Sequence, residues 1–189
     1  IKLRAPIFLT HLDEPDGSAL FDDATPNDFQ FICAGEACPT GGMEGRLRQA
    51  VEFNQPADIL TLSQSSLSAS ATAFSASVWI YPTLDKDTAQ SIFTINNGAN
   101  TAPRYAVSIQ PGSMFLTVQN RENIAADQIP QSNVELIKNT WNMVTLVVER
   151  TANNNGDNYY LYINGYLDSS WTSTTYGTVI RIDLVFQEK

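Results

Sequence analysis

A strict alternation of apolar and polar residues in two neighbouring segments limits what this chain can fold into. The first segment, W-N-M-V-T-L-V-V-E-R, runs from Trp141 to Arg150 and places Val144, Leu146 and Val148 on one face. The second, Y-Y-L-Y-I-N-G-Y-L, runs from Tyr159 to Leu167. Because successive side chains of a strand point to opposite faces, a period of two is typical of a half-buried strand. The two segments therefore predict paired antiparallel strands.

The dipeptide Asn164-Gly165 predicts the turn that follows the second segment. Asn-Gly is the preferred pair for a two-residue type I′ turn, since both central residues adopt positive φ. A hairpin centred on this turn has four predicted cross-strand pairs: Ile163 with Tyr166, Tyr162 with Leu167, Leu161 with Asp168, and Tyr160 with Ser169.

Alternating segments recur along the chain, and helical spacing is rare. Further alternation is found at 74–80, 105–109, 114–118 and 180–186, and 132–138 could hold one short helical turn. Many short strands separated by turn residues predict an antiparallel sandwich or barrel. Since no linker or internal repeat interrupts the pattern, we expect one domain over residues 1–189.

Composition excludes several classes of partner. The net charge is -9, which disfavours nucleic acid because phosphate backbones are bound by clustered Lys and Arg. No apolar run reaches the length of a membrane span. Hydrophobic residues make up 43% of the 189 residues, enough for a packed core.

The two cysteines, Cys33 and Cys38, predict a local disulfide. A zinc site would need two further ligands, and the chain has a single histidine, His11. A disulfide indicates an oxidising compartment, so we expect a secreted or cell-surface protein. Closing so short a loop stabilises the fold by about 2 kcal/mol.

Several segments together resemble one known family. H-L-D-E-P-D-G-S-A-L-F-D-D (11–23), F-S-A-S-V-W-I-Y-P-T (74–83), and N-T-W-N-M-V-T-L-V-V-E (139–149) with L-Y-I-N-G (161–165) are similar to segments of concanavalin A-like, laminin-G-like domains of bacterial surface proteins. The segment from Cys33 to Phe53 is similar to the family's second segment. The resemblance implies an all-β, two-sheet antiparallel jelly-roll sandwich used for recognition or adhesion, often with one structural calcium ion.

The resemblance weakens in two places. The family's F-D-G-x-x-D-Y reads F-N-Q-P-A-D-I here, which retains Asp58. The family's C-terminal strand is atypical from about residue 178, where I-D-L-V-F (182–186) is a remnant at most. A shortened closing strand predicts an exposed sheet edge that another chain could pair with.

Enzymatic activity is not expected. Glucanases of this fold class carry E-x-D-x-E on one strand, so that the carboxylates share a face. Here Asp13 and Glu14 are adjacent and point opposite ways, and His11 has no G-x-S-x-G serine context.

Acidic residues near the N-terminus suggest a calcium site, because calcium takes six to eight oxygen ligands. The expected ligands are Asp13, Glu14, Asp16, Asp22 and Asp23, joined by Asp183 if it matches the family's terminal-strand aspartate. The alternative is a solvated acidic turn, with Asp16-Gly17 making the bend.

Aromatic residues opposite the core face suggest a ligand surface. They are Trp79, Tyr81, Tyr160, Tyr162 and Trp171. Such rings can stack on sugars, since they offer flat apolar area with a polar rim. The alternative is that they pack under loops or form a minor core.

Two functions follow from these observations. The first is a non-catalytic module of a larger bacterial surface protein, which binds carbohydrate or a protein partner. The second is a structural spacer, or a subunit of an extracellular assembly that self-associates through a sheet edge.

Overall fold

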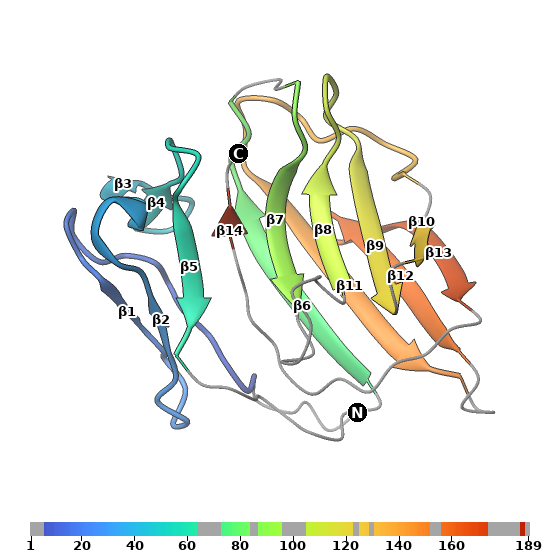
Figure 1. The fold of residues 1–189 in the computed structure, drawn as a ribbon, viewed down its shortest axis with the longest axis horizontal. Helices are drawn as coiled ribbons and strands as arrows, with labels where there is room; N and C mark the ends of the chain where they lie inside the picture. Colours follow the sequence, from blue (N-terminus) through green and yellow to red (C-terminus); the bar gives the residue numbers. More distant parts are fainter. Residues whose placement is uncertain are drawn as a thin grey trace.

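A computed structural model describes residues 6–63, 73–83, 87–95, 105–122, 125–128, 131–151, 156–173 and 186–187. These residues form fourteen strands in three antiparallel sheets and one short 3₁₀ turn, η1 (Gly35–Ala37) (Figure 1). The predicted all-β class is confirmed. Within this described part, no helix has the length and hydropathy that crossing a membrane requires.

The largest sheet has eight strands. Its order is β1 (Leu20–Asp22), β2 (Gln30–Ile32), β5 (Ile59–Leu62), β14 (Phe186–Gln187), β7 (Gln90–Ile95), β8 (Tyr105–Ile109), β9 (Leu116–Glu122) and β10 (Ala125–Gln128). The second sheet has the order β13 (Tyr166–Ser173), β12 (Asp157–Ile163), β11 (Asn142–Arg150) and β6 (Ala73–Ile80). A separate hairpin pairs β3 (Thr40–Glu44) with β4 (Gln49–Glu52).

The main core lies between the four-stranded sheet and strands β7 to β9, which form the facing layer in Figure 1. Val144, Leu146 and Val148, the alternating residues of β11, are buried there with Leu161 of β12. The predicted core face of the two long segments is therefore confirmed, and the two layers form the expected sandwich.

A second, smaller core lies under the N-terminal strands. Phe21, Phe31, Leu60 and Leu62 fill it from β1, β2 and β5. The last described strand, β14, joins this part to the sandwich, because it pairs with β5 on one side and with β7 on the other. Residues 186–187 thus lie inside a sheet. The prediction that a shortened closing strand leaves an exposed sheet edge is wrong at this position.

The predicted hairpin is confirmed at its turn and corrected beyond it. Asn164 and Gly165 have φ values of 52° and 83°, and Ile163 and Tyr166 pair as predicted. Tyr162 also pairs with Leu167, but a bulge then shifts the register by one residue. Leu161 faces Ser169 and Tyr160 faces Ser170, so the two remaining predicted pairs are wrong.

Asp168 accounts for the bulge. Its carboxylate accepts hydrogen bonds from the backbone N–H groups of Asn133 (2.8 Å) and Val134 (2.9 Å), and the Asn133 side chain donates to its carbonyl oxygen. These bonds hold the 131–141 loop against β13 in an irregular conformation, so the short helical turn predicted at 132–138 is wrong.

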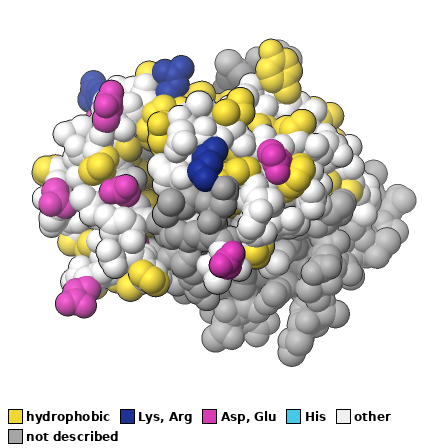
Figure 2. All heavy atoms as spheres, turned by 90° about the horizontal axis from the view of Figure 1, so that it is seen from above, with side chains coloured by type: hydrophobic (Ala, Val, Ile, Leu, Met, Phe, Trp, Pro, Cys, Tyr) yellow, Lys and Arg dark blue, Asp and Glu magenta, His cyan; other side chains and the backbone are white. Residues whose placement is uncertain are grey.

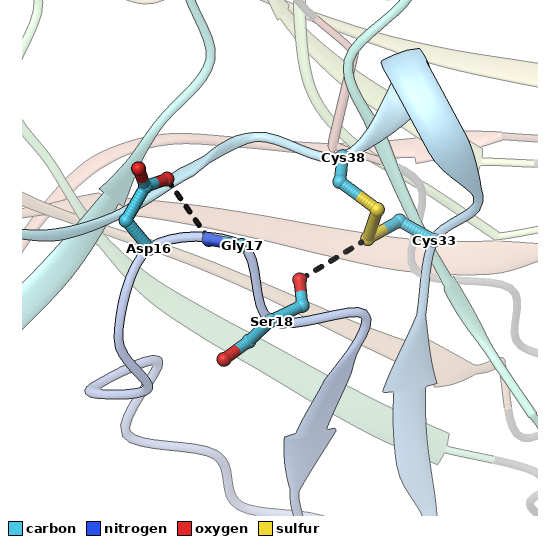
Figure 3. Close-up of a disulfide and its surroundings, with 5 residues drawn as sticks. All are labelled: Asp16, Gly17, Ser18, Cys33 and Cys38. Carbon is cyan, nitrogen blue, oxygen red and sulfur yellow. Dashed lines mark hydrogen bonds between the residues drawn. A yellow bond between two sulfur atoms is a disulfide. The ribbon is translucent and has the colours of Figure 1, made fainter.

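The predicted disulfide is present. Cys33 and Cys38 are bonded across η1 with a Cα–Cα distance of 5.0 Å (Figure 3). The N–H of Cys33 also donates to the carbonyl oxygen of Ala19, the residue just before β1. The bridge fixes the loop that leads from β2 into the β3–β4 hairpin.

Candidate functional site

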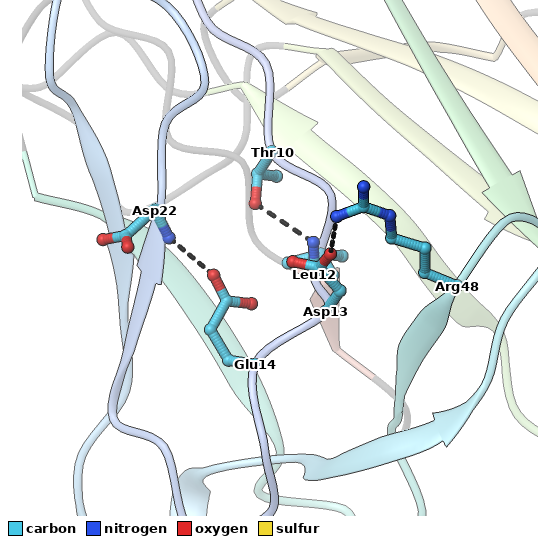
Figure 4. A network of polar contacts seen from close by, with 6 residues as sticks. All are labelled: Thr10, Leu12, Asp13, Glu14, Asp22 and Arg48. Atoms are coloured by element: carbon cyan, nitrogen blue, oxygen red, sulfur yellow. Dashed lines mark hydrogen bonds and ion pairs between the residues drawn. The ribbon is translucent and has the colours of Figure 1, made fainter.

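The five described acidic residues that were predicted to bind calcium each have a hydrogen-bond or ion-pair partner of their own. Asp13 forms an ion pair with Arg48 at 3.3 Å, and Glu14 accepts a hydrogen bond from the N–H of Asp22 at 2.8 Å (Figure 4). Asp16 accepts a bond from the N–H of Gly17 in its own turn (Figure 3). Local backbone donors and one arginine therefore take up oxygens that a cation would need.

These carboxylates do not gather around one point. In the part of the chain that the structure describes, no three His, Cys, Asp or Glu side chains are grouped to hold a metal ion. Figure 2 shows acidic side chains dispersed over the visible face. The side chains as placed do not supply the six to eight oxygens of a calcium site. Asp183 lies outside the described residues, and calcium binding stays a prediction.

Asp23 has a structural role in this segment. Its carboxylate accepts bonds from the N–H groups of Leu9 (3.0 Å), Thr25 (2.9 Å) and Phe29 (3.2 Å), and from the Thr25 hydroxyl (2.7 Å). Burial alone would raise the pKa of Asp23, but these donated bonds together lower it below the ordinary value. Asp23 thus ties the N-terminal segment to β1.

We expect stability to fall in acid through Asp23. A lowered pKa means that the stabilisation is present above the ordinary aspartate pKa and is lost as the pH falls through the folded-state value. Asp23→Asn should lower the free energy of unfolding at pH 7 by about 1 kcal/mol, a loss limited by solvent exposure. It should also flatten the pH dependence between about pH 5 and pH 3. Urea titrations over this range measure both effects, with Asp28→Asn as the charge-matched control. Parallel pH profiles for wild type and Asp23→Asn would contradict the assignment.

The outer face of the four-stranded sheet holds three of the five predicted aromatic residues, and a fourth, Tyr81, directly follows the end of β6. In β6 and β11 the residues that alternate with the core point outward, and Trp79 pairs with Met143. Tyr160 and Tyr162 occupy the equivalent positions of β12, where both are half-buried. Strands β12 and β6 flank β11 on opposite sides. Two strand spacings, roughly 10 Å, therefore separate Tyr160 and Tyr162 on β12 from Trp79 on β6.

One end of this outer face carries a cluster that we call the aromatic corner: Trp79, Tyr81, Trp141 and Arg46. Trp79 and Tyr81 remain 42% and 45% exposed. Tyr81 contacts Trp141 edge to face with ring centroids 5.5 Å apart. The Arg46 guanidinium comes from the loop between β3 and β4 and lies 5.3 Å from the centre of the Trp79 ring.

Buried polar contacts hold this end of the sheet in place. Asn142 is fully buried, and its amide bonds to the backbone of Ile137 and to the carbonyl oxygen of Thr140. The N–H of Asn139 donates to the carbonyl oxygen of Pro82 at 2.8 Å. These bonds fix the chain on both sides of Trp141 and just after Tyr81. The two rings are therefore presented by a supported loop.

Trp171 does not share the outer face, and its predicted placement is wrong. It pairs with Tyr159 and stacks on that buried ring, with centroids 5.6 Å apart and an interplanar angle of 5°. The predicted register, continued along β13, would have placed Trp171 opposite Asn158. The bulge at Asp168 shifts β13 by one residue, and a shift of one moves a side chain to the other face. Trp171 therefore packs against the core.

Two members of the aromatic corner were not among the predicted site residues. Trp141 is two residues before Met143, which points outward from β11. The alternation of β11, extended by one residue, therefore predicts an outward side chain for Trp141. Arg46 had no local signal, because its contact with Trp79 joins residues far apart in the sequence. Only the packing of the β3–β4 hairpin reveals it.

Comparison with known families identifies the fold. Residues 54–181 match a laminin-G-type family model, described as the concanavalin A-like lectin/glucanases superfamily. This chain belongs to that superfamily. The match includes β5 to β13, with Trp79, Tyr81 and Trp141 of the aromatic corner, and Arg46 lies outside it. It agrees with the family that the sequence motifs suggested.

Two solved structures resemble this concanavalin A-like chain. The carbohydrate-binding module CBM66 from Bacillus subtilis is 14% identical, with a TM-score of 0.45 over 85% of this chain and 92% of that one. An endo-1,3-beta-glucanase from Streptomyces sioyaensis is 9% identical, with a TM-score of 0.44 over 94% of this chain and 74% of that one. No curated protein matches the sequence.

Proposed function

We propose that this domain is a non-catalytic carbohydrate-binding module and that the aromatic corner is its binding surface. The observation that carries the proposal is the pair of exposed rings, Trp79 and Tyr81, on a supported sheet end. Large aromatic side chains are usually more buried than this. Membership of a superfamily of lectins and glucanases makes a glycan the ligand class that fits best.

The chemistry of the corner suits a sugar ring. The apolar face of a pyranose carries C–H groups that pack on an aromatic ring, while hydroxyl groups at its edge hydrogen bond to nearby polar groups. Trp79 supplies a large flat area, and Tyr81 adds a hydroxyl group beside it. Tyr160 and Tyr162 extend the same sheet face and are a second place where a longer chain of sugars could lie.

Binding without catalysis is favoured by the positions of the described carboxylates of the four-stranded sheet. Glycoside hydrolysis uses a pair of carboxyl groups about 5–9.5 Å apart across the scissile bond. On the described outer face, Glu149 pairs with Ala73 at the far end of β6, roughly 20 Å along the strand from Trp79. Asp168 is engaged by the 131–141 loop, and Asp157 is buried in the core.

The disulfide supports an extracellular location, because such bonds persist in oxidising compartments. Binding to an extracellular protein and self-association as a structural subunit stay predictions. They would be favoured if no glycan bound.

Trp79→Ala is expected to weaken glycan binding at least tenfold, because it removes the largest stacking surface of the corner. A tenfold loss corresponds to about 1.4 kcal/mol, which is within the range for one buried aromatic contact. The measurement is affinity electrophoresis against soluble polysaccharides that are first identified on a glycan array. Tyr166→Ala is the matched control, since this ring is 81% exposed at the hairpin tip and outside the corner.

Equal binding by wild type and Trp79→Ala would contradict the placement of the site. If Tyr162→Ala alone abolished binding, the ligand surface would lie on the row of β12 instead. Hydrolysis of a bound polysaccharide, detected as new reducing ends, would contradict the non-catalytic assignment.

A further inference from the structure

We propose that the preferred ligand of the aromatic corner is an acidic polysaccharide whose sugars carry carboxylates, and that Arg46 recognises this group. The inference rests on the proposed function and narrows its ligand class. It depends on the position of Arg46, on the state of its hydrogen-bond donors and on the net charge of the chain.

The β3–β4 loop fixes where Arg46 lies. Gly45 donates its N–H to the carbonyl oxygen of Arg48 at 2.9 Å, which closes the loop. A Cβ on Gly45 would come within 2.3 Å of the carbonyl oxygen of Gln49, so a side chain at this position would force the hairpin apart. The glycine therefore allows the tight loop, and the loop places Arg46 over Trp79.

The guanidinium of Arg46 has unused donors. With the described residues it makes a contact with the Trp79 ring but no hydrogen bond or ion pair. Arg48, two residues later, differs because it pairs with Asp13 at 3.3 Å. The ring face attracts the positive charge but offers no carbonyl or carboxylate oxygen, so the N–H groups of Arg46 still have no oxygen acceptor among the described residues. Arg46 is thus prepared for an acceptor that the described chain does not provide.

A carboxylate is the acceptor that this arrangement suits. Two parallel N–H groups of a guanidinium match the two oxygens of a carboxylate, and the charge strengthens both bonds. In a uronic acid the carboxylate projects from the edge of the sugar ring. With that group at Arg46, the ring can lie over the exposed parts of Trp79 and Tyr81. A neutral sugar would leave the guanidinium without an ionic partner.

The overall charge makes the local cation necessary. At -9, the chain as a whole repels polyanions, so an acidic glycan would bind where a cation is available beside apolar rings. This predicts recognition of one or a few uronic acid units at the corner, in place of broad electrostatic binding along the surface.

The test compares acidic polysaccharides with neutral counterparts. Polygalacturonate, polyglucuronate and alginate are used beside galactan, a β-glucan and mannan in affinity electrophoresis. We expect at least one acidic polymer to bind the domain at least tenfold more tightly than its neutral counterpart. Arg46→Gln should remove this preference with a loss of roughly tenfold to a hundredfold. Arg46→Lys should restore part of it, because it keeps the charge but loses the paired N–H geometry. Arg48→Gln is the charge-matched control and should bind as wild type does.

The outcomes separate this inference from the proposed function. Binding of a neutral polysaccharide that depends on Trp79 but not on Arg46 would overturn the acidic preference and leave carbohydrate binding intact. Equal losses in Arg46→Gln and Arg48→Gln would indicate general charge attraction and would also overturn it. Failure to bind any of the six polymers or any glycan on an array would contradict both proposals.

Discussion

Replacing Asp157 with alanine is expected to lower the free energy of unfolding by about 3–5 kcal/mol, because it removes one member of a buried ion pair. Asp157 is 2% exposed at the start of β12. One carboxylate oxygen accepts a hydrogen bond from the Tyr105 hydroxyl at 2.9 Å, and the other lies 3.7 Å from Nε of Arg150. Without the carboxylate, the largely buried Arg150 guanidinium and the buried Tyr105 hydroxyl each lose one partner.

Urea denaturation measures this loss, and Tyr105→Phe is the control that isolates one contact. Tyr105→Phe removes the hydroxyl and keeps the ring, so it should cost about 1 kcal/mol. The double variant should show strong coupling, since both changes remove the same hydrogen bond. A free energy of unfolding for Asp157→Ala within 1 kcal/mol of wild type would mean that the pair contributes little.

Tyr159→Ala is expected to cost about 3–5 kcal/mol through the loss of a large buried ring. Tyr159 is fully buried between Tyr105, with centroids 6.0 Å apart, and Trp171, with centroids 5.6 Å apart. Truncation would open a cavity on the contact surface of both rings. The effect is measured by urea denaturation.

The adjacent residue supplies a matched control. Tyr160 is the same residue type on the same strand, but it points to the outer face and is half-buried. Tyr160→Ala should therefore cost about 1 kcal/mol or less. Similar losses for the two variants would contradict the assignment of the two faces of β12.

The strand faces could be predicted from the sequence because the period of two is a local property. The alternation in β11 identified Val144 and Leu146 as core residues, and the Asn164-Gly165 turn was correctly placed. The outward position of Trp79 followed from the same alternation in β6. These features depend on residues a few positions apart.

The errors arose where a distant segment changes the local structure. The bulge at Asp168 depends on backbone donors of Asn133 and Val134, and it turned Trp171 from the outer face to the core. The carboxylates near the N-terminus suggested convergence, yet backbone N–H groups and Arg48 bind several of them separately. No pattern of neighbouring residues encodes which of several partners a carboxylate takes.

The position of β14 has a consequence for the order in which this domain can form. A ribosome makes residues 186–187 after every other described strand, and yet they separate β5 from β7 in the finished sheet. While the chain is being made, the N-terminal strands and the sandwich strands can each collapse on their own cores, but they cannot yet be joined into one sheet. Such late pairing between residues far apart in sequence is slow, because the loop entropy is lost before the contact is gained. We therefore expect folding in two stages, with docking of the N-terminal strands as the final step.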